Sequence, residues 1–270
     1  MRVASRRLRS ALRDFMPYLR KRGLPHVLKQ LRKIARALGE VRDLDVAIPA
    51  LEDLQKQIPA KFLPALKQST DTRNEVRERA REGLTAILQT NHLQQFESEF
   101  IAAVNQATAP REGKPQISFS EMSSAIIQDR LKELERLSDG LFRPFDVEPL
   151  HEMRIAAKRL RYAIELFEQC WKRSIGSYAK HAARLQTALG DVHDCDVWIE
   201  SFGKQINEAR KNKQDEQVAA FVWLLSYFTK LRNKHLRKAF REWSAWEAHD
   251  VSGKLRAALQ PEERNTQSHL

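Results

Sequence analysis

Two short motifs occur twice in this chain, in the same order and at nearly the same separation. Residues 1–9, MRVASRRLR, align with residues 153–161, MRIAAKRLR. Residues 38–46, LGEVRDLDV, align with residues 189–197, LGDVHDCDV. Because chance is a poor explanation for two matches in one order, the chain is predicted to contain two related halves. Each half is therefore predicted to contain one copy of each motif.

The remaining pattern of the chain is helical. The strongest apolar periodicity has the helical period, and only nine of the 270 residues are glycine. We predict an all-α protein with four helices in each half and no strand, so that each half is a four-helix bundle. Prolines stand where these helices are predicted to begin, turn or end, at Pro17, Pro25, Pro59, Pro64, Pro144 and Pro149.

The segment at residues 106–117 is predicted to be the linker between the halves. Residues 106–116, QATAPREGKPQ, collect two prolines, a glycine and small polar side chains, which are typical of a connection. The first helical-bundle half is then residues 1–105, and the second is residues 118–260. Residues 261–270 are predicted to be a disordered tail, and the two halves together form one domain.

The charge balance of the chain points to an anionic partner. Lys and Arg number 47 against 35 Asp and Glu, which gives a formal net charge of +12. Such a balance is typical of proteins that bind nucleic acid, an acidic membrane surface or a phosphate polymer, although the charge could also merely solvate long helices. No run of eighteen apolar residues exists, so no membrane span is predicted.

The cellular compartment is predicted from the N-terminus and the cysteines. Residues 1–9 are too charged for a signal peptide. Cys170 and Cys195 have no CxxC spacing and are predicted to be small core residues or free thiols of a reducing compartment. A cytoplasmic location is therefore the default expectation.

The first helix of each half carries a basic stripe beside its apolar face. Close cations at the edge of a core repel one another strongly, so the stripe is predicted to line a groove that takes an anion. Alternatively, the basic side chains of the stripe extend along the apolar surface towards solvent and pair with nearby Asp and Glu residues. The predicted binding residues are Arg2, Arg6, Arg9 and Arg13 beside Leu8, Leu12, Phe15, Met16 and Leu19, and Arg154, Lys158 and Arg161, with His151 at the edge, beside Leu160, Ile164 and Phe167.

Two further basic helices follow in each half. In the first of them, Lys29, Arg32, Lys33 and Arg36 share one helix face, and Lys180 and Arg184 occupy the matching positions in the second half, so all six are predicted anion ligands. Glutamates dilute the other basic helix, and we predict that it is an ordinary solvated face. It contains Arg73, Arg77, Arg79 and Arg81, with Arg232, Lys234, Arg237 and Lys238 as a loose counterpart.

Four aspartates recur in the second motif and are predicted to pair with arginines and orient them: Asp43, Asp45, Asp194 and Asp196. The sequence His193–Asp194 could indicate a metal-dependent phosphohydrolase. However, Arg42–Asp43 stands at the same place in the first half, and arginine cannot ligate a metal. The chain has no glycine-rich phosphate loop, nucleophile elbow or Cys/His metal spacing, so no cofactor, metal or catalytic residue is predicted. A phosphate-chain-processing enzyme that uses these four aspartates is the alternative.

These motifs resemble the conserved histidine α-helical domain family, called CHAD. The resemblance rests on HEMRIAAKRLRY at residues 151–162, on its copy at residues 1–9, and on LGEVRDLDV and LGDVHDCDV. It covers nearly the whole chain and implies two four-helix bundles related by a pseudo-two-fold axis around a central basic channel. It also implies non-enzymatic binding of inorganic polyphosphate, with polyphosphate granules or a separate CYTH-type triphosphate enzyme as further partners.

The first half departs from the family pattern at one position. The family histidine precedes the Met–Arg pair by two residues, and His151 satisfies this in the second half. The first copy opens at Met1. We therefore expect either that residues further upstream supply this histidine or that the first half binds without it.

The composition of the stripes favours a simple phosphate polymer. Polyphosphate offers charge but no bases, so regularly spaced Lys and Arg suffice to bind it. Sites for single-stranded nucleic acid usually interleave aromatic residues with the basic ones. The stripes of residues 2–9 and 29–36 contain no aromatic side chain. Nucleic-acid backbone and an acidic protein stay open as alternative partners.

Overall fold

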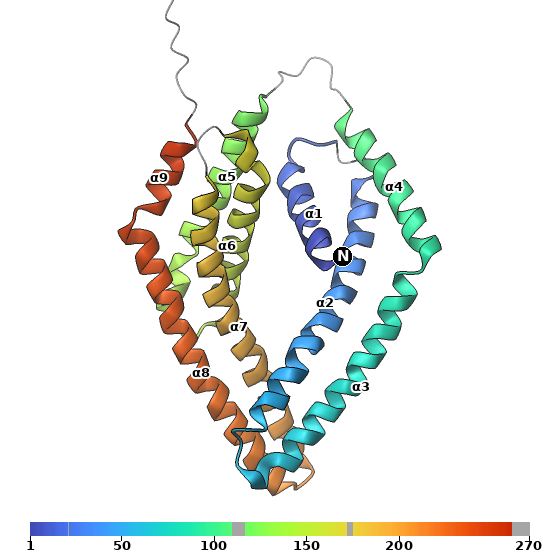
Figure 1. Cartoon of the computed structure of the whole chain (residues 1–270), viewed down its shortest axis with the longest axis vertical. Coiled ribbons are helices and arrows are strands. Elements are labelled where there is room, and N and C mark those ends of the chain that lie inside the picture. The colour runs from blue at the N-terminus through green and yellow to red at the C-terminus, as the bar shows by residue number, and fades with distance from the viewer. Residues whose placement is uncertain (21, 110–116, 172–174, 261–270) are drawn as a thin grey trace, which may run out of the picture. The chain divides into compact units, whose positions relative to one another are not determined.

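The computed structural model describes residues 1–20, 22–109, 117–171 and 175–260 (Figure 1). Within these residues all regular structure is helical and there is no strand, so the prediction of an all-α protein is confirmed. No described helix combines the length and the apolar character that a membrane span requires. The α-helices are α1 (Arg2–Phe15), α2 (Leu24–Leu54), α3 (Leu63–Ile87), α4 (Thr90–Thr108), α5 (Phe119–Arg136), α6 (Val147–Phe167), α7 (Gly176–Lys211), α8 (Asp215–Ala248) and α9 (Val251–Ala258), with short 3₁₀ helices η1 (Ala60–Phe62), η2 (Ser138–Phe142) and η3 (Glu168–Cys170).

The chain divides into two compact units. The first consists of Met1–Gly113 and Ile199–Tyr227, and the second of Lys114–Trp198 and Phe228–Leu270. Helices α7 and α8 are long enough to contribute to both units, whereas α1 to α4 belong to the first, and α5, α6 and α9 to the second. The predicted halves, their bundle arrangement and their duplication stay predictions.

Proline and capping residues explain where several helices begin and end. Helix α1 ends two residues before Pro17, and Pro25 and Pro64 lie in the first turns of α2 and α3. Proline is tolerated there because the first N–H groups of a helix have no intrahelical acceptor. Helix α5 begins with a capping box, in which Ser118 and Glu121 each bond to the other's backbone N–H.

The structure differs from the sequence-based expectation at two boundaries. The second half contains a fifth α-helix, α9, because Asp250 adopts a left-handed backbone (φ 45°) and accepts a hydrogen bond of 3.1 Å from the Gly253 N–H. Helix α4 continues to Thr108, since residues 106–108 of the predicted linker are helical. Residues 110–116 of that linker and the predicted tail at 261–270 lie outside the described residues.

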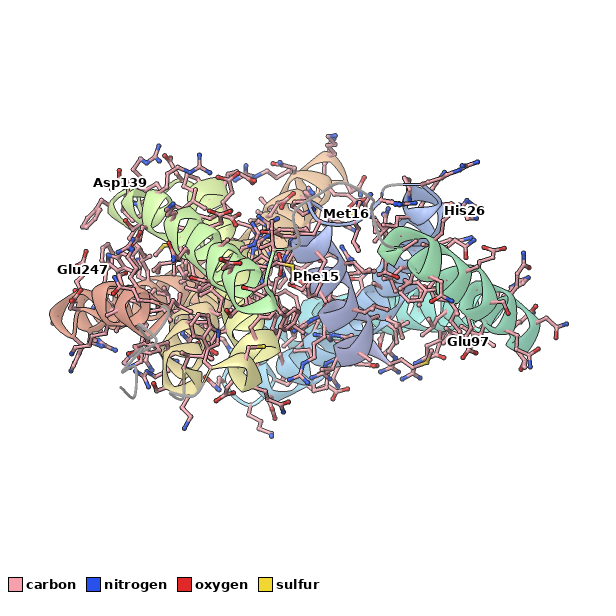
Figure 2. All side chains as sticks on the ribbon, turned by 90° about the horizontal axis from the view of Figure 1, so that it is seen from above. Phe15, Met16, His26, Glu97, Asp139 and Glu247 are labelled. Atoms are coloured by element: carbon pink, nitrogen blue, oxygen red, sulfur yellow. The ribbon has the colours of Figure 1, made fainter. Side chains whose placement is uncertain are left out.

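The first unit is built on α2, which packs against α1, α3 and α4. Leucines and valine of α2 form a buried cluster with Leu12 of α1 and with Ala103 and Ala107 of α4. Leu8, Met16 and Leu19 pack against the same cluster, and Figure 2 labels Met16 just beyond α1. The apolar face predicted for the first helix is therefore the face that meets the core.

The second unit is built on α6, which packs against α5 (Figure 1). The side chains of Leu160, Ile164 and Phe167 are fully buried, as the sequence predicted, and so are Met153 and Ala157. The buried residues follow one face of α6, and its charged side chains border this face.

Both cysteines are free thiols, in agreement with the sequence prediction. Cys195 is buried in the second unit, whereas Cys170 is half-buried. Burial, together with the charge of the neighbouring Asp196, raises the pKa of the Cys195 thiol to about 12. The Cys195 side chain therefore acts as a small apolar core residue.

Replacing Phe167 by alanine should destabilise the second unit by about 3–5 kcal/mol, because its ring is fully buried. The adjacent Leu166 is 43% exposed, and Leu166→Ala should cost less than about 1 kcal/mol. Urea unfolding followed by circular dichroism measures both changes in the free energy of unfolding. Equal losses in the two variants would contradict the assignment of this face of α6 to the core.

Candidate anion-binding site

Helix α6 places a row of three cations beside the core of the second unit. Arg154, Lys158 and Arg161 follow an i, i+4, i+7 spacing, which puts them along one side of the helix. All three are half-buried, whereas a cation on a fully solvated face would be exposed. We call these three residues the α6 cation row. The row thus borders the apolar face, in agreement with the geometry expected from the sequence.

A pair of histidines lies beside the α6 cation row. His151, in the second turn of α6, meets His193 of α7, with the two Nδ1 atoms 3.2 Å apart. The ring centroids are 4.5 Å apart, and the rings are tilted by 51°. The sequence predicted His151 as a ligand, whereas His193 was not in the predicted set of ligands. Helical periodicity could not have found this pair, because it joins two helices.

Burial and the neighbouring cations hold both histidines in the neutral form near neutral pH. Burial lowers the pKa of His193 to about 4, and the positive charges of Arg154, His151 and Lys158 act in the same direction. The pKa of His151 is also lowered, first by burial and then by Arg154. These shifts locate Arg154 and Lys158 close enough to the imidazoles to act on them electrostatically.

A groove of about 590 Å³ lies between α6 and α7 at the far end of the row. Arg161 and Lys180 line it, so the structure brings together two of the predicted ligands from different helices. Glu165 also lines the groove and accepts a 2.7 Å hydrogen bond from Arg161 Nε, while Arg161 Nη1 donates to Gln186 at 3.3 Å. The groove therefore presents two cations, and hydrogen bonds fix the position of Arg161.

The first unit carries the corresponding stripe on α1. Arg2, Arg6 and Arg13 are half-buried, and Arg9 is exposed. Arg13 donates to Ser10 Oγ at 2.8 Å and lies 3.5 Å from a carboxylate oxygen of the buried Asp14. The α1 stripe thus borders the core as α6 does, but Arg13 already has a local carboxylate partner.

The second predicted stripe is exposed in both units. Arg36 of α2 pairs with Glu40 at 3.0 Å, and Arg184 of α7 pairs with Glu242 at 3.3 Å and contacts His181. A solvated position screens such charges and weakens their interactions. These side chains therefore differ from the α6 cation row in burial; the exposed set is Lys29, Arg32, Lys33, Arg36, Lys180 and Arg184.

Two of the four recurring aspartates hold arginines of the third basic helix. Asp45 lies 3.2 Å from Arg81 Nη2, and Asp196 lies 2.5 Å from Arg232 Nε. Each pair spans 36 residues, so the arginines stand at matching positions after the two aspartates that the repeat aligns. The other two recurring aspartates, Asp43 and Asp194, are exposed. Asp45 and Asp196 thus each pair with an arginine, and these two arginines lie outside the predicted stripes.

Arg232 is a residue that the sequence analysis assigned wrongly, because it is buried and not part of a solvated face. Its side chain and that of Asp196 are only 8% and 9% exposed. Arg232 also donates a 2.7 Å hydrogen bond to the carbonyl oxygen of Pro144, three residues before α6 begins. Since Asp196 lies one turn after His193, Arg232 fixes the start of α6 against the part of α7 that carries His193.

Arg73, on the corresponding helix of the first half that was also predicted to be solvated, is enclosed as well. It donates to Ser201 Oγ at 3.0 Å and to the carbonyl oxygen of Ser69 at 3.0 Å, and its guanidinium lies over the ring of Phe202. Burial lowers the pKa of Arg73. This arginine therefore joins α3 to α7 within the first unit.

Comparison with known proteins identifies a domain family and a similar fold. The family model of the CHAD domain matches residues 1–203. The crystal structure of the CHAD domain from the plant Ricinus communis superposes with a TM-score of 0.63 at 24% sequence identity, over 96% of this chain and 79% of that chain. No curated protein sequence matches the chain.

Removing Arg232 should leave the buried Asp196 carboxylate without its guanidinium. Arg232→Ala should therefore lower the free energy of unfolding by about 3–5 kcal/mol. Arg81 and Asp45 are 47% and 33% exposed, so Arg81→Ala at the matching position should cost less than about 1 kcal/mol. Urea titrations of the two variants test this contrast, and a larger loss in Arg81→Ala would refute it.

Acidification should destabilise the folded chain through His193. The pKa of His193 is about 4 in the folded chain, against an ordinary value of 6.5, so the unfolded chain binds the proton more readily between these values. Acidification from about pH 6.5 towards about pH 4 therefore favours unfolding. Gln cannot titrate, so the free energy of unfolding should fall less with pH in His193→Gln than in the wild type, while the exposed His92→Gln should behave as the wild type does. Parallel pH profiles for all three proteins would show that His193 titrates normally.

Proposed function

Because this chain belongs to the CHAD domain family, we propose that it binds inorganic polyphosphate and does not convert it chemically. The binding residues of the second unit are the α6 cation row with His151 and His193, continued by Lys180 across the groove. The α1 stripe is the corresponding site of the first unit.

The half-burial of the α6 cation row is the observation that carries this proposal. Two cations beside an apolar core repel each other more strongly than in water, and a bound anion removes that repulsion. A phosphate oxygen accepts charge-assisted hydrogen bonds from Arg and Lys, and these are stronger where water is partly excluded. Arg154 and Lys158 therefore form a better anion site than the exposed lysines and arginines of α2.

The spacing of the row favours an extended anion over a single phosphate. Arg154 and Arg161 are seven residues apart on α6, which corresponds to about 10 Å along the helix axis. Successive phosphates of a chain can contact cations distributed over this length. Lys180 in the groove extends the cationic surface beyond Arg161.

The matching ion pairs support the proposed duplication. Asp45–Arg81 and Asp196–Arg232 join the same motif position to an arginine at the same sequence distance. Both therefore connect a recurring aspartate to the next long basic helix. Duplication of one helical unit explains this correspondence.

Removing two cations of the row should abolish most of the binding. Arg154→Ala with Lys158→Ala should weaken the affinity for polyphosphate about a hundredfold, since each charged hydrogen bond contributes about 1.5 kcal/mol or more. Isothermal titration calorimetry with chains of one defined length, near physiological salt, measures this change. An assay of phosphate release from the same samples, with added Mg²⁺, tests whether the protein leaves the polyphosphate uncleaved, as we expect.

A charge-matched control separates a dedicated site from net charge. Lys234 and Arg237 of α8 are exposed and lie on one face, so Lys234→Ala with Arg237→Ala removes the same charge. This variant should bind within about threefold of the wild type, because exposed charges are screened. Arg159 is unsuitable as a control because it pairs with Glu133 of α5. Equal losses in the two double variants, at matched helix content, would show that net charge alone drives binding.

A further inference from the structure

The contact between His151 and His193 restricts how many protons the two rings can carry. With the Nδ1 atoms 3.2 Å apart, one nitrogen has to donate and the other has to accept. Two protonated rings would each point an N–H at the other, whereas one protonated ring can donate its Nδ1–H to its neutral neighbour. The geometry therefore has room for one additional proton on the pair and excludes a second.

The charges around the pair decide whether that proton is present. Arg154 and Lys158 oppose it, while Glu148 and Glu152 favour it at His151. On α7, Asp194 is adjacent to His193 and exposed. The cations act on both rings, so an anion placed on the cation row would remove the largest charge effect that keeps the rings neutral.

Charged side chains of α8 and α5 near the histidine pair have carboxylate partners, as Arg161 of the row has in Glu165. On α8, Arg232 pairs with Asp196, and His235 and Lys238 lie 3.5 Å and 3.3 Å from Asp191. On α5, Glu133 pairs with both Arg130 and Arg159. These are charged side chains that α5 and α8 contribute around α6 and α7.

We infer that the His151–His193 pair couples anion binding to proton uptake, so that a polyphosphate chain laid along the α6 cation row draws one proton from solvent onto the pair. This inference rests on the proposed function and adds a pH dependence to it. The proton enters one imidazole, which becomes an additional cation and hydrogen-bond donor for the chain. No covalent bond forms or breaks.

The direction of the effect follows from the charges. In the free protein His193 has a pKa of about 4 and is neutral near neutral pH. A polyanion nearby favours the charged imidazole and raises its pKa. Binding is then accompanied by proton uptake, and affinity increases as pH falls through the raised pKa, by at most about tenfold per pH unit for one proton.

Calorimetry in two buffers of different ionisation enthalpy measures this proton directly. The whole protein is titrated with polyphosphate of one defined length near pH 6.5. The titration gives the number of protons taken up for each polyphosphate molecule bound. The wild type should take up most of one proton more than either His193→Gln or His151→Gln. Two separate variants keep the test valid if one of them folds poorly, and circular dichroism checks the fold of each.

The terminal phosphates of the probe also titrate near neutral pH, but their contribution is the same for every protein and cancels in the difference. His92→Gln is the matched control, because His92 is exposed at the start of α4 and should change neither affinity nor proton uptake. Tight binding with equal proton uptake in the wild type and both pair variants would overturn the inference and leave the proposed function standing. The absence of binding at every pH would overturn both.

Discussion

The buried apolar face of α6 is the constraint on which the candidate site depends. Met153, Ala157, Leu160, Ile164 and Phe167 are all fully buried along this one face of the helix. The α6 cation row and His151 lie beside it. Charges that would disperse over a solvated helix are thereby concentrated beside the core, where their mutual repulsion is strongest.

Arg232 transmits this constraint to the neighbouring helices. It binds Asp196 of α7 and the carbonyl oxygen of Pro144, and so connects α8, α7 and the turn before α6. The His151–His193 contact lies within a turn or two of these bonds along α6 and α7. A buried ion pair costs desolvation, and this one is best understood as fixing the position of the helices that carry the histidines.

The sequence predicted those features that depend on one helix at a time. Periodicity assigned Leu8, Leu12, Leu160 and Phe167 to the core, and proline positions marked the ends of α1 to α3. Contacts between helices were out of reach, because His151 and His193 are 42 residues apart and nothing local brings them together. Arg232 looked solvated for the same reason, since both of its partners are distant in sequence. The break before α9 depends on a left-handed backbone at Asp250, which no periodic signal predicts.

A crystal structure of the chain grown with polyphosphate would test the assignment of the site most directly. Phosphate oxygens should lie within hydrogen-bonding distance of Arg154 and Lys158, with the chain continuing along α6 towards Arg161. Ring nitrogens of His151 and His193 should face the same polyphosphate chain. Phosphates ordered only against the exposed side chains of α2 or α8, with the α6 cation row unchanged, would contradict the assignment.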